Sequence, residues 1–183
     1  MIRWRQMRPR ILPPQDDRKG NLRARHGRIW TFGLAMAITG LDQAAKLIVD
    51  ATLPPDGATI GSLFDLQRVS NAGINFGLLR DHPVPILIAS ASVGVAFASY
   101  VALRPPLRWW PVVGFALLLG GAFGNVIDRI RMGAVFDYLN ITPFVGYLNL
   151  ADLAIGAGVL ALVIGNMRGR SLTPDKSNKP LGP

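Results

Sequence analysis

The chain has 183 residues, of which half are hydrophobic and 17% are charged, whereas about 25% of the residues in a typical soluble domain are charged. It contains no Cys and only two His, which excludes disulfides, thiolate metal sites and cysteine nucleophiles and argues against a histidine-rich metal site. The net charge of +9 comes from Lys and Arg that flank apolar stretches, so we expect contacts with membrane lipids and no binding of nucleic acid.

The first 28 residues hold nine of the 20 Lys and Arg residues, mixed with Pro and Asp, and show little periodicity. This composition predicts a basic, disordered tail over residues 1–28. The apolar stretch that follows, residues 29–49, is longer than the roughly 7–15-residue core of a cleaved signal peptide. We therefore interpret it as a retained membrane helix.

Two ionisable residues, Asp42 and Lys46, lie within this first apolar stretch. Charged side chains are costly inside a membrane and often mark a functional site. Because the two residues are four positions apart, they share a helix face and can form an ion pair. The sequence leaves two interpretations open: a pair that holds helices together, and direct contact with a ligand.

The link from residue 50 to residue 83 is long for a simple connection, and its middle part places apolar residues between Gly-containing turns. These residues are Ile60, Leu63, Phe64, Leu66 and Val69. The pattern predicts one or two short strands on the membrane surface, and a partly inserted loop is the alternative.

Three further apolar stretches, residues 84–103, 109–127 and 150–166, approach the roughly 20 residues that a membrane helix needs. We therefore predict an all-α integral membrane protein with four transmembrane helices and a small extracytoplasmic β element between the first two. The membrane domain is expected over residues 29–167, followed by a cytoplasmic tail over residues 168–183. Lys and Arg gather in the two terminal tails and in the short link between the second and third stretches. Because such residues favour the cytoplasmic side, both termini are expected in the cytoplasm and the longer links outside.

The third apolar stretch ends in a block of small and polar residues. Gly120 and Gly124 form a small face that allows close approach of another helix. Asn125 and Asp128 are three apart and share a face at the outer membrane boundary. Arg129 is expected to pair with Asp128 or to contact a lipid phosphate. We interpret Asn125 and Arg129 mainly as a polar buttress between helices.

Asp137 lies in the apolar run 134–139. A carboxylate in such a run is partly desolvated, and desolvation raises its pKa. The neighbours Val135, Phe136 and Tyr138 are poor turn formers, which favours a functional role over a turn.

The fourth stretch opens with Asn149, a good N-cap residue, and Asp152 would then be the third helical residue. Taken alone, this spacing indicates helix capping and a favourable interaction with the helix dipole. The combination with Asp137 changes the interpretation, because both carboxylates are expected at the same outer surface.

Two nearby carboxylates do not both ionise easily, so they share a proton and titrate as a pair. One member can accept a proton from water while the other donates to a carbonyl oxygen. This is the chemistry of aspartic peptidases, and it needs no metal or other cofactor.

Three alternatives remain open from the sequence. The first is a Mg²⁺ site built from Asp42, Asp128, Asp137 and Asp152 in a lipid-modifying enzyme. The second is a small transporter or channel subunit that uses Asp42 and Asp128 as an ion relay. The third is a scaffold without catalytic activity.

Five separated blocks resemble motifs of the lipoprotein signal peptidase family, also called signal peptidase II. They are D-Q-A-A-K at 42–46, N-A-G-I-N-F-G at 71–77, G-G-A-F-G-N-V-I-D-R at 120–129, V-F-D-Y at 135–138 and N-L-A-D at 149–152. Each block alone is weak, but five in order together with four spans are specific.

The resemblance implies a bacterial inner-membrane aspartic endopeptidase that removes the signal peptide from diacylglyceryl-modified prolipoproteins, just before the lipobox Cys. It also implies inhibition by globomycin-type cyclic peptides, and we expect a monomer. Asp137 and Asp152 would be the catalytic pair. The matching supporting positions are Asp42, Lys46, Asn71, Gly73, Asn125, Asp128, Arg129 and Asn149.

Overall fold

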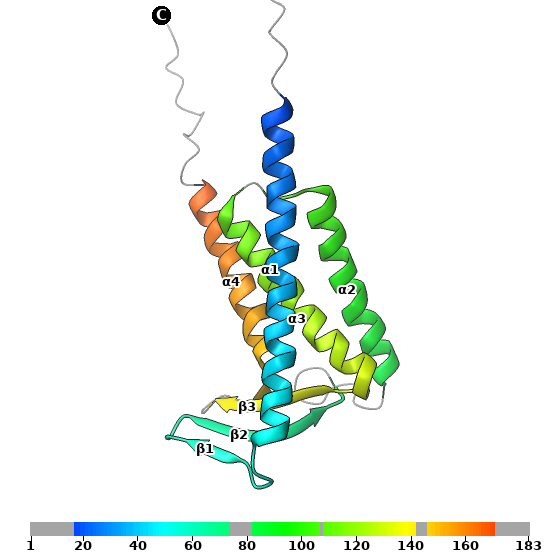
Figure 1. The fold of residues 1–183 in the computed structure, drawn as a ribbon, viewed down its shortest axis with the longest axis vertical. Coiled ribbons are helices and arrows are strands. Elements are labelled where there is room, and N and C mark those ends of the chain that lie inside the picture. Colours follow the sequence, from blue (N-terminus) through cyan, green and yellow to red (C-terminus); the bar gives the residue numbers. More distant parts are fainter. Residues whose placement is uncertain (1–16, 74–81, 107, 142–145, 171–183) are drawn as a thin grey trace, which may run out of the picture.

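The computed structural model describes residues 17–73, 82–106, 108–141 and 146–170. Its helices form a bundle, and a small sheet lies at one end of that bundle (Figure 1). The elements in chain order are α1 (Asp17–Thr52), β1 (Ala58–Ile60), β2 (Phe64–Asn71), α2 (Pro83–Leu103), α3 (Trp109–Met132), β3 (Val135–Ile141), β4 (Tyr147–Leu148) and α4 (Leu150–Arg170).

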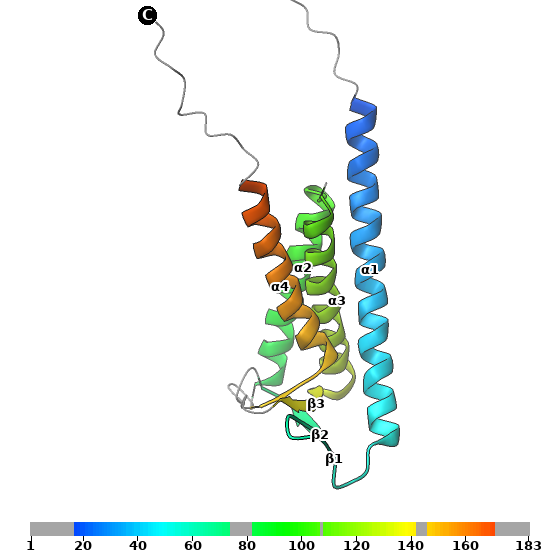
Figure 2. The ribbon, with the colours of Figure 1, turned by 90° about the vertical axis from the view of Figure 1, so that its left-hand side faces the viewer.

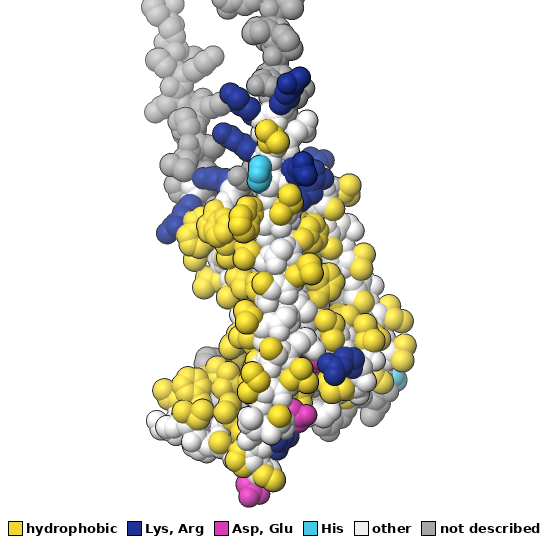
Figure 3. Space-filling view, in the orientation of Figure 1, with side chains coloured by type: hydrophobic (Ala, Val, Ile, Leu, Met, Phe, Trp, Pro, Cys, Tyr) yellow, Lys and Arg dark blue, Asp and Glu magenta, His cyan; other side chains and the backbone are white. Residues whose placement is uncertain are grey.

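All four helices are long and apolar enough to cross a membrane, which confirms the predicted four spans. Large apolar side chains such as Met36, Ile88 and Leu160 are exposed around the bundle, where lipid would cover them. Figure 3 shows this apolar surface between the basic side chains at the end of the bundle where α1 begins and the sheet at the other end.

The central helix is α3, which packs against α1, α2 and α4. Figure 2 shows α1 and α4 on opposite sides of it. Its glycines permit this packing: a Cβ at Gly120 would lie 2.8 Å from the Ala35 carbonyl oxygen, and one at Gly124 would lie 2.5 Å from Oδ2 of Asp42. The predicted small-residue face on this helix is therefore confirmed.

The sheet is antiparallel with the order β1-β2-β3-β4. The predicted β element corresponds to β1 and β2. We did not predict β3 and β4, which add the segment carrying Asp137 to the same sheet. The sequence between α3 and α4 contains a short apolar run but no regular alternation, so its strand character depends on pairing with β2.

The first helix begins earlier than predicted. We expected a disordered tail through residue 28, but α1 begins at Asp17 and has 36 residues, a length of about 54 Å at the usual helical rise. Arg, Lys, Leu and Ala favour helix, and an existing helix extends at little cost. Gly27 also packs directly against the Pro106 backbone. At the other end, α4 extends three residues past the predicted boundary. Residues 1–16 and 171–183 lie outside the described residues.

Candidate active site

A buried three-residue ion cluster connects α1 with α3. The Lys46 ammonium lies 2.7 Å from Asp42 Oδ2 and 2.6 Å from Asp128 Oδ2. All three side chains are buried, with exposures of 5% or less. The predicted pair within α1 thus forms. Asp128 pairs with Lys46 rather than with its sequence neighbour Arg129.

Each carboxylate of this cluster also holds a backbone N–H group next to one of the two candidate catalytic residues. Oδ1 of Asp42 accepts a hydrogen bond from the N–H of Ala151, at 2.8 Å, immediately before Asp152. Oδ2 of Asp128 accepts one from the N–H of Phe136, at 3.2 Å, immediately before Asp137. The ion cluster therefore fixes the two chain segments that carry the candidate pair.

Asp152 is positioned by a reciprocal cap at the start of α4. Oδ1 of Asn149 accepts a hydrogen bond from the Asp152 N–H at 2.9 Å, and Oδ2 of Asp152 accepts one from the Asn149 N–H at 3.2 Å. This is the geometry of a capping box. The second oxygen, Oδ1, accepts a hydrogen bond from the Asn125 amide at 2.8 Å. Capping and a role in the site are thus compatible for Asp152.

Asp137 lies on β3 and is almost fully buried. Its two oxygens accept hydrogen bonds from the Asn71 amide at 2.8 Å and from the Asn149 amide at 2.6 Å. In the register of β2 and β3, Asn71 is opposite Val135, so its side chain reaches Asp137 diagonally across the strands. Oδ1 of Asn71 accepts the Gly73 N–H at 3.1 Å, which orients the amide.

Burial raises the pKa of the Asp137 carboxyl to about 6. The hydrogen bond from Asn71 opposes this increase, and the negative charge of Asp152 adds to it. Weaker lowering effects come from Asn149 and from the positive charge of Lys46. The direction agrees with the sequence-based expectation that an apolar run would desolvate this carboxyl group.

Two asparagines connect the candidate pair. Asn149 donates its side-chain amide to Asp137 and its backbone N–H to Asp152. Asn125 donates to Asp152 and accepts hydrogen bonds from Asn149 at 3.1 Å and from Lys46 at 3.3 Å. The two carboxyl groups therefore belong to one hydrogen-bonded unit, although they come from a strand and a helix.

Arg129 is the least engaged of the predicted site residues. Its Nη atoms lie 3.5 Å from the carbonyl oxygens of Asn125 and Gly73. Its Nε atom is buried and makes no hydrogen bond with any residue in the described part of the chain. The described residues show no ion pair between Arg129 and Asp128, whose partner is Lys46. Contact of Arg129 with a lipid phosphate stays a prediction.

Gln43 is a site residue that the sequence reasoning did not single out. Its amide donates to Asp128 at 2.9 Å, to the Gly124 carbonyl at 3.2 Å and to Asp42 at 3.3 Å. The available signal was its position directly after Asp42 in a motif block.

The ion cluster also bears on the Mg²⁺ alternative. Within residues 17–73, 82–106, 108–141 and 146–170, no three His, Cys, Asp or Glu side chains are grouped to hold a metal ion. Two of the four proposed ligands, Asp42 and Asp128, instead surround the Lys46 ammonium. A cation of the protein itself thus occupies the space between them.

Comparison with known proteins adds independent findings. Residues 34–168 match a protein family described as signal peptidase (SPase) II. The lipoprotein signal peptidase of Gloeobacter violaceus is 36% identical over 149 residues, which cover 79% of this chain and 86% of that protein. The one from Moorella thermoacetica is 36% identical over 131 residues, covering 70% and 87%.

The fold also resembles that of a solved bacterial membrane enzyme. The two structures align with a TM-score of 0.70 and 24% sequence identity, over 81% of this chain and 94% of the other. This likeness concerns the fold alone. The helical extension of α1 before residue 34 lies outside the matched family region.

Proposed function

The chain belongs to the signal peptidase II family, and from that premise we propose that Asp137 and Asp152 are the catalytic pair with which it cleaves its substrates. As a member of this family, the chain is a membrane peptidase that removes signal peptides from prolipoproteins. The observation that carries the residue assignment is the single hydrogen-bonded unit in which Asn149 contacts both carboxyl groups.

In the proposed mechanism the pair carries one proton, and Asp137 holds it because burial raises its pKa. Asp152, which is more exposed than Asp137, accepts a proton from a water molecule as that water attacks the scissile carbonyl carbon. Asp137 donates its proton to the carbonyl oxygen, which gives a neutral tetrahedral diol. Asp152 then protonates the leaving amine, and Asp137 recovers a proton from the diol as the peptide bond breaks.

The remaining residues are proposed to position this pair. Lys46, Asp42 and Asp128 hold the segments before Asp137 and Asp152 in place through backbone N–H groups. Four further residues orient the carboxyl groups or the adjacent backbone. They are Asn71, Gly73, Asn125 and Asn149. Arg129 is partly exposed and its Nη atoms make only long contacts, and it is proposed to contact the substrate backbone.

The proposed substrate is a prolipoprotein whose lipobox Cys carries a diacylglyceryl group, cut just before that Cys. A site at the end of the bundle can receive the acyl chains and the apolar signal helix directly from the lipid. We further propose that the chain lies in the bacterial inner membrane with both termini in the cytoplasm, and that the site faces the periplasm or the cell exterior. Globomycin-type cyclic peptides are proposed to block the site. Residues 29–167 would suffice as a monomeric peptidase domain.

Cleavage by the purified full chain tests the proposed substrate. We expect a diacylglyceryl-modified prolipoprotein to be cut before its modified Cys, as determined by mass spectrometry of both products, and we expect EDTA to leave the rate unchanged. The matched control is the same precursor without the lipid. Equal cleavage of both precursors would contradict the proposed lipid requirement, and loss of activity with EDTA would contradict a metal-free carboxyl pair.

The pH profile should report the protonation of Asp137. Because this group donates a proton in the proposed mechanism, kcat/KM should fall as the pH rises above about 6, with a slope approaching tenfold per pH unit. The hydrogen bond from Asn71 lowers the pKa of Asp137. The Asn71→Ala variant should therefore shift this decline to higher pH.

The control for this measurement is Gln67→Ala, which removes a side-chain amide from the same strand, β2. This amide accepts a hydrogen bond from Tyr147 and does not contact Asp137. Its decline should coincide with that of the unchanged protein. If kcat/KM of Asn71→Ala is lower but falls at the same pH as in the unchanged protein, Asn71 has another role.

A further inference from the structure

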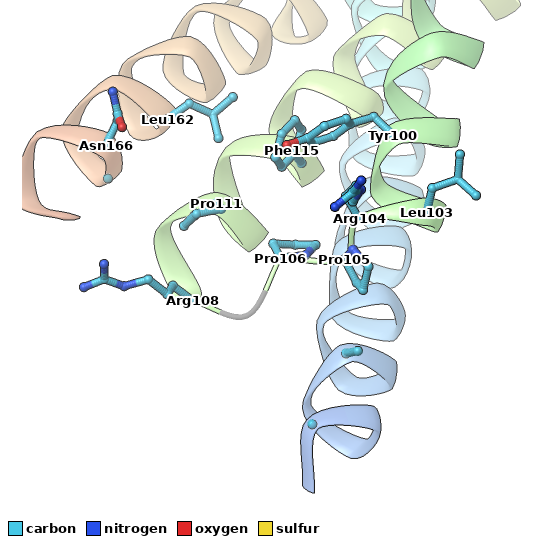
Figure 4. A pocket seen from close by; sticks show the side chains of 13 residues that line it. Tyr100, Leu103, Arg104, Pro105, Pro106, Arg108, Pro111, Phe115, Leu162 and Asn166 are labelled. Atoms are coloured by element: carbon cyan, nitrogen blue, oxygen red, sulfur yellow. The ribbon is translucent and has the colours of Figure 1, made fainter. Parts of the chain in front are cut away.

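A cavity of about 840 Å³ opens at the end of the bundle where α1 begins, opposite the end that carries Asp137 and Asp152. It lies among the first turns of α1 and α3 and the last turns of α2 and α4 (Figure 4). Its walls include Tyr100, Phe115 and Leu162, and two arginines, Arg104 and Arg108, belong to its lining. None of the described residues that line it is acidic.

The two arginines differ from Arg28 and Arg168, which also lie at this end of the bundle. Arg28 donates a hydrogen bond to a backbone carbonyl of α2, at 3.1 Å, and Arg168 lies over the ring of Trp110, 4.9 Å from its centre. In contrast, the side chains of Arg104 and Arg108 make no ion pair or hydrogen bond with any residue that the structure describes. Both side chains are exposed and remain available for an anion.

The depth of the cavity corresponds to the boundary between lipid chains and headgroups. Trp109, Trp110 and Tyr100 are exposed around it, and Trp and Tyr are enriched at that boundary. Arg108 and Asp128 are separated by 20 positions along α3, which corresponds to about 30 Å. The cavity is therefore a second site and not an extension of the aspartate site.

We propose that this cavity binds one anionic phospholipid. Its phosphate would lie between Arg104 and Arg108, and its glycerol and first acyl carbons would lie against Phe115 and Leu162. A guanidinium pairs with phosphate through parallel N–H donors. The apolar walls distinguish a lipid from a free anion, since inorganic phosphate gains nothing from Phe115 or Leu162. This inference does not depend on the chemistry proposed for the aspartates.

The test uses the full chain purified in a mild detergent, with phosphatidylglycerol added as the probe and binding measured by native mass spectrometry. Phosphatidylcholine and inorganic phosphate are the comparison probes. We expect one phosphatidylglycerol molecule per chain and weaker retention of both comparison probes. The Arg104→Gln/Arg108→Gln variant should bind phosphatidylglycerol about thirtyfold more weakly, which corresponds to about fivefold for each basic residue near the headgroups.

Two further variants separate the cavity from general charge. Arg18→Gln/Arg25→Gln removes the same charge from exposed positions of α1 that do not line the cavity, and it should bind the lipid as the unchanged protein does. Ala24→Phe keeps every charge but projects a ring into the cavity, and it should weaken binding. Equal weakening by Arg18→Gln/Arg25→Gln, unchanged binding by Ala24→Phe, or displacement of the lipid by millimolar phosphate would overturn the proposal.

Discussion

Replacement of either Asp137 or Asp152 by Asn is expected to reduce prolipoprotein cleavage by at least about a thousandfold, without unfolding the protein. Asn keeps the size and one acceptor oxygen of each carboxyl group but can neither deprotonate a water molecule nor donate the proton of a carboxylic acid. Either change therefore removes one of the two proton transfers that bond cleavage requires. The measurement is the rate of signal-peptide release at saturating lipidated substrate.

Three controls make this result specific. Asp56→Asn makes the same chemical change at an exposed loop position between α1 and β1 and should retain full activity. The melting temperature of each variant, measured in the same detergent, should stay close to that of the unchanged protein. The double variant should be about as inactive as either single one, because residues that act as a unit are not additive. Substantial cleavage by a folded single variant would refute the assignment of that residue.

The second large effect is expected from Lys46→Met. Its ammonium is the shared partner of Asp42 and Asp128, and all three side chains are buried. Removal of one partner leaves buried carboxylates uncompensated, which typically costs about 3–5 kcal/mol. The free energy of unfolding in detergent should decrease by about this amount. Cleavage should decrease too, because the cluster holds the backbone before Asp137 and Asp152.

The matched control is the triple variant Asp42→Asn/Lys46→Met/Asp128→Asn. It removes all three charges, so no charge is left buried without a partner, and both Asn side chains keep an oxygen that can accept the N–H groups of Ala151 and Phe136. It should be more stable than Lys46→Met alone, since replacement of a whole buried ion cluster is often neutral. A Lys46→Met variant as stable as the unchanged protein would show that the cluster does not support the site.

Several features of the site could be predicted because they depend on spacing within one element. Asp42 and Lys46 are four positions apart on a helix, which brings them together whatever surrounds that helix. Asn149 and Asp152 have the spacing of a capping box, and they form one. The apolar neighbours of Asp137 also predicted the direction of its pKa shift.

Other features were not predictable because they join elements distant in sequence. Asn71 reaches Asp137 only through the register of β2 and β3, which includes a shift between Leu66 and Val69. The sequence suggested Arg129 as the partner of Asp128, but the orientation of α3 turns this carboxylate towards Lys46 of α1. The contact of Gly27 with the link between α2 and α3 is of the same kind.

The sequence by itself determined the number of membrane helices and the identity of the polar residues within them, because hydrophobic length and local spacing follow directly from the order of residues. Only the tertiary structure decided which partners these carboxylates have: Asp42 and Asp128 surround Lys46, whereas Asp137 and Asp152 both contact Asn149. Close packing of α1 against α3 at Gly124 brings Asp42 to the start of α4. Pairing of β2 with β3 brings Asn71 to Asp137. Both depend on how elements pack together, which local spacing does not specify.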